Sequence, residues 1–208
     1  MPSPNQILSE LYRITNELIY VAILWHIYFA IVAVLFVARV CRSIRWLGAL
    51  LAMPVLSVAM TAWIHGNPFN GSLFTFVWVV LMAIVLRLPR QPVEFGPQWM
   101  VITGVFLFLF AWFYPHFLNA SSVWMYSYAT PVGLIPCPTL SASIGGSLIF
   151  YALFSRAWIL ILAVMGLFYG FFGALVLGVR LDFILAIGGF VALLASVYLN
   201  KSRSDRQR

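Results

Sequence analysis

The sequence has 208 residues, of which 63% are hydrophobic and only 8% are charged. A soluble globular domain has about 45–50% apolar and about 25% charged residues, so this composition excludes a water-exposed surface over most of the chain. The net charge of +7 does not indicate nucleic acid, because the basic residues lie between apolar segments. The composition predicts one membrane domain with the lipid bilayer as its main partner.

Residues 1–17 predict an amphipathic helix that lies along the membrane interface. Ser3, Pro4 and Gln6 match a helix start, with an N-cap serine, a proline at the first position and a capping-box glutamine. Apolar residues then recur at helical spacing, at Ile7, Leu8, Leu11, Ile14 and Leu18. We expect this helix to lead directly into the first span.

Residues 18–200 form the predicted transmembrane domain, an all-α bundle of seven spans. Each apolar segment is close to the ~20 residues that cross a hydrocarbon core of ~30 Å. The segments are Leu18–Val40, Leu47–His65, Ser72–Leu88, Met100–Leu118, Pro138–Phe154, Ala157–Leu177 and Leu181–Asn200. The third and fifth are the shortest, so six spans is the alternative.

The basic residues predict the orientation, because those in short loops stay in the cytoplasm during membrane insertion. With seven spans, all of the 12 basic residues except Arg13 and Arg180 fall on one face. The basic residues on that shared face are Arg39, Arg42, Arg45, Arg87, Arg90, Arg156, Lys201, Arg203, Arg206 and Arg208. The N-terminus is therefore predicted outside, and residues 201–208 form a basic cytoplasmic tail.

All three histidines fall on the outer half of this arrangement. His26 lies within the first segment, His65 ends the second, and His116 is near the outer end of the fourth. Ionisable groups inside a bilayer are costly and by default mark a site or pathway. The alternative for His65 and His116 is an interfacial position in contact with water and headgroups. Glu17 and Asp182, at the outer ends of the first and seventh segments, are expected to balance charge.

Cys137 directly precedes the fifth segment and stands between two prolines. A thiol at a helix N-terminus is near the positive end of the helix dipole, which favours the thiolate. Imidazole and thiolate ligands suit zinc or copper(I). We therefore name His65, His116 and Cys137 as a candidate metal or substrate site, and His26 as a second binding position deeper in the membrane. The alternative for Cys137 is a small buried residue at a rigid helix start.

The second cysteine, Cys41, is predicted on the opposite side of the bilayer from Cys137, so both are expected to be free thiols. The segment from Asn119 to Cys137 is a longer, uncharged outer loop that contains Trp124, Tyr126 and Tyr128. Tyrosine and tryptophan favour the membrane interface, and loops of this length are often functional. We expect a lid or a re-entrant hairpin here.

Small residues crowd the fifth and sixth segments. Gly145 and Gly146 lie in the fifth, and Gly166, Gly170 and Gly173 follow one another in the sixth. Small residues let membrane helices approach closely, so these positions predict helix packing. The alternative is an unwound, permeant-lining stretch in the fifth segment.

Several features together resemble an uncharacterised family of bacterial polytopic integral membrane proteins. They are the chain length, the acidic N-terminal helix before a Tyr/Trp/His-rich first span, and the stretch Gly133-Leu134-Ile135-Pro136-Cys137-Pro138-Thr139. The resemblance covers nearly the whole chain. It implies a bacterial inner-membrane location, and it implies no activity, cofactor or catalytic residue.

The remaining motifs do not identify a reaction. No lysine lies within a span to carry a retinal Schiff base, and no G-x-S-x-G, H-E-x-x-H or Walker A motif occurs. We therefore expect a small transporter or permease with an outward-facing His/Cys site and do not expect an enzyme. The alternatives are a membrane-embedded redox or enzyme subunit, and a structural or assembly subunit. A homo-oligomer or a complex with other membrane subunits is compatible with each.

Overall fold

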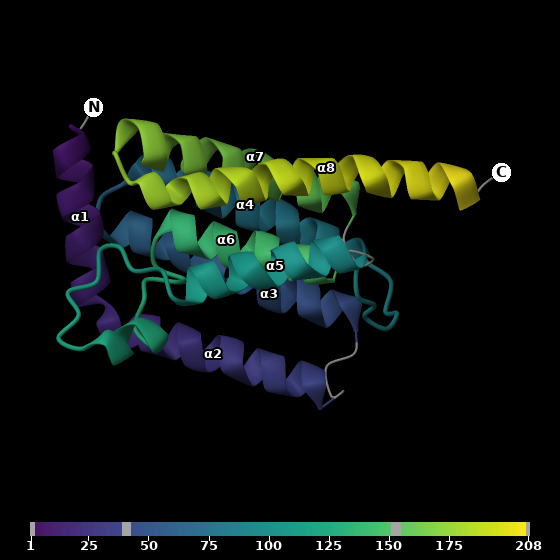
Figure 1. Ribbon diagram of the computed structural model, residues 1–208, viewed down its shortest axis with the longest axis horizontal. Coiled ribbons are helices and arrows are strands. Elements are labelled where there is room, and N and C mark those ends of the chain that lie inside the picture. Colours follow the sequence, from purple (N-terminus) through teal and green to yellow (C-terminus); the bar gives the residue numbers. More distant parts are fainter. Residues whose placement is uncertain (1–2, 39–42, 151–154, 207–208) are drawn as a thin grey trace.

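The computed structural model describes residues 3–38, 43–150 and 155–206, with side chains up to residue 198. These residues form an all-α bundle in which α2 to α8 run along the long axis and α1 lies across one end (Figure 1). The helices are α1 (Pro4–Glu17), α2 (Ile19–Val37), α3 (Ile44–Ile64), α4 (Pro68–Arg87), α5 (Gln98–Trp112), α6 (Pro136–Ile149), α7 (Arg156–Phe171) and α8 (Phe183–Arg206). The predicted helical bundle is confirmed.

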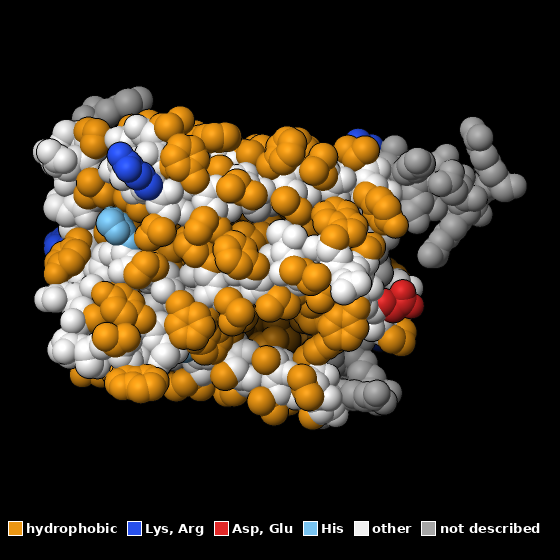
Figure 2. Space-filling view, in the orientation of Figure 1, with side chains coloured by type: hydrophobic (Ala, Val, Ile, Leu, Met, Phe, Trp, Pro, Cys, Tyr) orange, Lys and Arg blue, Asp and Glu red, His pale blue; other side chains and the backbone are white. Residues whose placement is uncertain are grey.

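Five described helical segments are long and apolar enough to cross a membrane. They are Ile19–Val37, Ile44–Ile64, Pro68–Arg87, Arg156–Val176 and Arg180–Tyr198. Large hydrophobic side chains cover the long face of the molecule, whereas the charged side chains visible on that face lie toward its two ends (Figure 2). An apolar surface of this extent is unfavourable in water. The fold is that of a multi-pass protein in a lipid bilayer.

Helix α1 begins at the predicted capping box. The Ser3 amide donates to the Gln6 side chain at 2.8 Å, and the Gln6 amide donates to the Ser3 hydroxyl at 3.3 Å. The apolar face of α1 buries Ile14 against the bundle and leaves Glu10 and Arg13 exposed. Leu18 separates α1 from α2 and marks the change of direction seen in Figure 1.

Two predicted segments have different ends in the structure. Helix α4 begins at Pro68 instead of Ser72, because the Asn67 side chain caps it by accepting from the Asn70 amide at 3.0 Å. It therefore has 20 residues and is not short. Helix α5 ends at Trp112 instead of Leu118, because the following Pro115 has no amide hydrogen and disfavours a helical residue before it.

Other predicted boundaries are only partly described. The ends at Val40 and Phe154 lie outside the described residues, as do Arg39, Cys41, Arg42 and Arg208. Helix α8 continues through the predicted tail as far as Arg206.

Helix α6 lies at the centre of the bundle. It has 14 residues, and all of them from Pro138 to Leu148 are buried. Its backbone is close to that of α5: a Cβ placed on Gly145 would lie 2.6 Å from the Gly104 carbonyl oxygen. A Cβ on Gly146 would lie 2.9 Å from the Leu51 side chain of α3. Glycine at both positions lets two neighbouring helices approach α6.

Helices α7 and α8 pack through small residues in the same way. A Cβ on Gly166 would lie 3.2 Å from Gly189 of α8, and one on Gly170 would meet the Ala186 backbone. The α7 helix then widens into the π-helical turn η3 (Phe172–Val176), which contains Gly173. A turn of this kind is often found at functional sites.

Helix α2 is held to α3 by two polar contacts. The Trp25 indole donates to the Ser57 hydroxyl at 2.9 Å, and the Tyr28 hydroxyl donates to the Leu50 carbonyl at 2.9 Å. An open groove of about 490 Å³ lies between these two helices. Helix α2 therefore packs less closely than the helices around α6.

The close approach of α5 and α6 generates a stability prediction. We expect Gly145→Ala to lower the free energy of unfolding by about 1–3 kcal/mol, because the added methyl group overlaps the α5 backbone. The control is Ala30→Val, which enlarges an exposed position of α2. Thermal melting in detergent compares the two, and equal melting temperatures would contradict the packing described.

Candidate functional site

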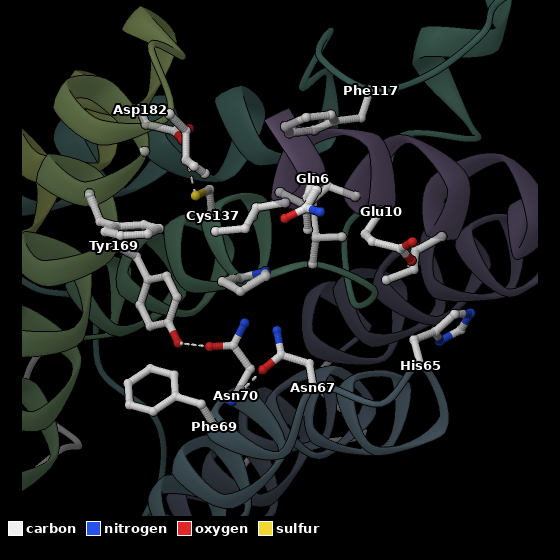
Figure 3. Close-up of a pocket in the computed structure, with 18 of the residues that line it drawn as sticks. Gln6, Glu10, His65, Asn67, Phe69, Asn70, Phe117, Cys137, Tyr169 and Asp182 are labelled. Carbon is white, nitrogen blue, oxygen red and sulfur yellow. Dashed lines mark hydrogen bonds between the residues drawn. The ribbon is translucent and has the colours of Figure 1, made fainter. Parts of the chain in front are cut away.

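A cavity of about 450 Å³ lies at the end of the bundle that α1 crosses. Its wall consists of the inner face of α1, the start of α4, the first turn of α6 and the end of α7 (Figure 3). Most lining side chains are apolar, including Ile7, Leu11 and Phe117. Its volume is in the usual range of about 300–1,000 Å³ for small-molecule sites.

Asp182 lies at the inner end of this cavity and is only 1% exposed. Its carboxyl group accepts a hydrogen bond from the Tyr114 hydroxyl at 2.8 Å and one from the Cys137 thiol at 3.1 Å. Figure 3 shows the Cys137 sulfur directed toward Asp182. Each carboxyl oxygen therefore has one neutral donor as its partner.

The turn between α7 and α8 positions Asp182. Gly178 has a φ of +74°, which reverses the chain, and the Val179 amide donates to the Gly173 carbonyl at 2.9 Å. Asp182 ends the short 3-10 helix η4 (Arg180–Asp182), where its amide donates to the Val179 carbonyl at 2.9 Å. A Cβ on Gly173 would meet the Asp182 carboxylate, so glycine leaves the space that this side chain occupies.

Tyr114 follows α5 and is fully buried. Burial raises the pKa of its phenol above the ordinary value, and the neighbouring Cys137 and Asp182 raise it further. The hydroxyl therefore keeps its proton and donates to Asp182. Tyr114 was not named from the sequence, where Tyr114-Pro115 indicates only a helix end.

A second polar contact lies on the opposite wall of the cavity. The Tyr169 hydroxyl of α7 donates to the Asn70 side chain of α4 at 2.6 Å (Figure 3). Both residues line the cavity. This pair could not be predicted from the sequence, because an asparagine near a helix start and a tyrosine within a span have no special spacing.

His65 lies at the edge of the cavity. Its Nδ1 donates to the Thr61 carbonyl at 2.8 Å, and its ring points away from Cys137 in Figure 3. The His65 Nε2 lies 3.9 Å from a carboxylate oxygen of Glu17, which makes an ion pair when the imidazole is protonated. This contact joins the end of α3 to the end of α1.

The other two histidines lie elsewhere. His116 is exposed, packs edge-on against the Phe117 ring at 4.4 Å, and is outside the cavity lining. His26 is buried, and its Nδ1 donates to the Ala22 carbonyl at 2.8 Å. Its Nε2 lies 3.2 Å from both the Thr130 hydroxyl and the Trp112 carbonyl. His26 thus joins α2 to the end of α5 and to Thr130 in the segment between α5 and α6.

The described residues contain no group of three His, Cys, Asp or Glu side chains that could hold a metal ion. Of the three residues expected to converge, His65 and Cys137 share a cavity and His116 does not. Asp182 and Glu17, expected to balance charge, contact Cys137 and His65 respectively.

Comparison with known proteins gives no family for this chain. No protein-family model, curated protein or solved structure matches it. Its function is therefore inferred from the residues and the geometry of the cavity.

We predict that Tyr114→Phe lowers the free energy of unfolding by about 1–3 kcal/mol, because Asp182 loses a buried donor. Tyr20→Phe, at an exposed tyrosine, is the control and should have little effect. Unfolded tyrosine loses its proton near pH 10, whereas folded Tyr114 keeps it. The wild type should therefore lose stability above about pH 10, and Tyr114→Phe should lose less. Identical pH profiles would contradict this.

Proposed function

We propose that this protein is a small multi-pass transporter or permease of the bacterial inner membrane, and that the cavity is its outer substrate site. The observation that carries the proposal is the position of this cavity. It lies between an amphipathic helix at one end of the bundle and the first turn of the central helix α6. A substrate bound there would be in contact with both the outer surface and the interior of the bundle.

The proposal includes seven spans with the N-terminus outside. Helices α3 and α7 begin, and α4 ends, at the end of the bundle opposite α1 (Figure 1). Arg45, Arg87 and Arg156 lie in the terminal turns of these helices at that end of the bundle. Basic residues there favour that end as the cytoplasmic side. The short helices α5 and α6, with 15 and 14 residues, would complete the seven spans.

Reporter fusions test this topology. Fusions after Arg45, Arg90, Arg156 and Arg208 should report cytoplasm, and fusions within residues 121–130 should report the outside. An outside signal after Arg208 would contradict a seven-span protein with its C-terminus inside.

Hydroxyl side chains continue from the cavity along α6. Ser141 donates to the Leu107 carbonyl at 3.1 Å, and Ser147 accepts from the Trp158 indole at 2.9 Å. Between them, the buried Ser143 hydroxyl has no hydrogen-bond partner. Polar groups inside a membrane bundle are costly and commonly mark a pathway, so this series supports a route through the centre.

Helix α1 is the proposed outer gate, and the Asn16 side chain holds it closed. The Asn16 side chain donates to the Phe117 carbonyl at 2.9 Å and accepts from the Asn119 amide at 2.8 Å. Phe117 has a φ of +72°, an unfavourable conformation for a phenylalanine, which the surrounding contacts must maintain. Release of Asn16 would therefore free α1 and the outer segment together.

Thiol labelling tests the site and the gate. In a Cys41→Ala background, a membrane-impermeant maleimide added from outside should label Cys137. Asn16→Ala should raise the labelling rate by about tenfold or more, because two tertiary hydrogen bonds of α1 are lost. Ser9→Ala is the matched control, since the Ser9 hydroxyl contacts only the Gln6 carbonyl within α1.

Labelling of Cys137 only from the cytoplasmic side would overturn an outer site. Equal labelling rates of Cys137 in Asn16→Ala and Ser9→Ala would show that α1 does not control access to the cavity.

A membrane-embedded enzyme that uses Cys137 is the second candidate. It is favoured by the position of this thiol in the cavity wall. However, the thiol donates to Asp182, and a thiolate there would place a second negative charge beside the carboxylate. Cys137→Ser separates the two functions: it should leave transport largely unchanged and would abolish catalysis by a cysteine nucleophile.

A further inference from the structure

We infer that the cavity binds a small organic cation with an apolar body, and that Asp182 holds its positively charged group. This inference rests on the proposed function, because it names the class of substrate for the same cavity. It starts from a buried carboxyl group that receives hydrogen bonds from neutral groups and forms no ion pair among the described residues, although the His116 imidazole is near enough to interact with it electrostatically.

A buried carboxylate without a countercharge is costly, even when it is hydrogen-bonded. Tyr114 and Cys137 each supply one neutral donor, whereas an ionised carboxylate can accept about four. Acceptor capacity therefore remains on Asp182 at the inner end of the cavity. An ammonium group can provide both the missing charge and additional donors.

The rest of the lining carries no competing positive charge. No lysine or arginine is among its described residues, and its ionisable groups are Glu10, His65, Cys137, Tyr169 and Asp182. The Arg13 guanidinium pairs with Glu10 at 2.6 Å on the exposed face of α1, away from the inner end. The electrostatic balance of the cavity therefore favours a cation over an anion.

Aromatic side chains would surround the body of such a ligand. Figure 3 shows Phe69, Phe117 and Tyr169 around the cavity, and Phe172 also lines it. Aromatic faces attract cations and bury apolar groups, so these walls suit an organic cation better than a hydrated metal ion.

The first turn of α6 is a poor anion site despite being a helix N-terminus. Such sites bind anions through free amide hydrogens, but Pro136 and Pro138 have none. The nearby Gly133 amide already donates to the Thr139 hydroxyl at 2.8 Å. The positive end of the helix dipole is met by the Asp182 carboxyl group, which accepts a hydrogen bond from the Cys137 thiol in the first turn of α6.

Three probes of similar size test the inference: 2-phenylethylamine, which is a cation at pH 7, neutral 2-phenylethanol, and anionic phenylacetate. Competition against tritiated 2-phenylethylamine on the purified full-length protein gives the three affinities. We expect the amine to bind at least about tenfold more tightly than the alcohol, and the alcohol more tightly than the acid. Asp182→Asn should remove most of the amine preference, because Asn keeps the shape and the acceptor for Tyr114 without the charge.

Glu94→Gln is the matched control, since it removes one negative charge at an exposed position outside the cavity and should leave the preference unchanged. If Asp182→Asn does not fold, the affinities of the wild type for the amine, the alcohol and the acid still test the inference. Equal affinities of the wild type for amine and alcohol, no saturable amine binding, or an unchanged preference in Asp182→Asn would each overturn the inference.

These outcomes are distinct from failure of the proposed function. If external maleimide labels Cys137 but amine and alcohol bind equally, the outer site stands and the cation inference is wrong. If Cys137 is labelled only from the cytoplasmic side, the outer substrate site itself is wrong.

Discussion

The burial of α6 among its neighbours is the constraint on which the cavity depends. Gly104 and Gly145 allow the α5 and α6 backbones to approach until there is no room for a Cβ, and Gly146 admits the Leu51 side chain of α3. In a bilayer, helix association depends on such packing and on interhelical hydrogen bonds, because lipid is as apolar as the side chains. Since α6 is fixed in this way, its first turn forms a rigid inner wall, and Cys137 has one position relative to α7 and α8.

The packing of α6 with its neighbours also accommodates the buried carboxyl group of Asp182, which is costly to bury. A carboxylate at this depth is costly, and the structure offsets the cost with the Tyr114 hydroxyl, the Cys137 thiol and the end of the α6 dipole. The π-helical turn and Gly173 leave space for its oxygens. Such departures from the simplest stable packing are expected where a protein has a functional site. The carboxyl group is thus held in place by the packing of the helices around it.

The end of the bundle that α1 crosses combines buried contacts with more exposed ones. His26 joins α2 to the end of α5 and to Thr130, and these groups are buried. Helix α1, in contrast, is held by two Asn16 hydrogen bonds, of which one is partly buried and one exposed, by the 3.9 Å His65–Glu17 contact and by an apolar face. Because few polar contacts hold α1 to the bundle and part of them is exposed, α1 is the element at this end that can separate with least loss. His26 thus connects buried elements, and the proposed transport assigns the necessary mobility to α1.

The sequence by itself determined the helical elements, because their causes are local. Apolar length defined the membrane helices, and Ser3, Pro4 and Gln6 defined the start of α1. The glycines of the fifth and sixth segments could be assigned to packing from their size alone. Local chemistry also explains the errors in the element ends, since the Asn67 cap extended α4 and Pro115 shortened α5.

Only the tertiary structure decided which side chains meet. His116 and Cys137 appeared equivalent from their depth in the sequence, yet His116 is exposed while Cys137 contacts Asp182, 45 residues away. Tyr114 joins the same carboxylate across 68 residues. Hydropathy fixes the depth of a residue in the membrane, but it contains no information about the rotation of a helix or the neighbours that it faces. Those depend on how the α6, α7 and α8 backbones pack, and that packing placed the acid, the thiol and the phenol together.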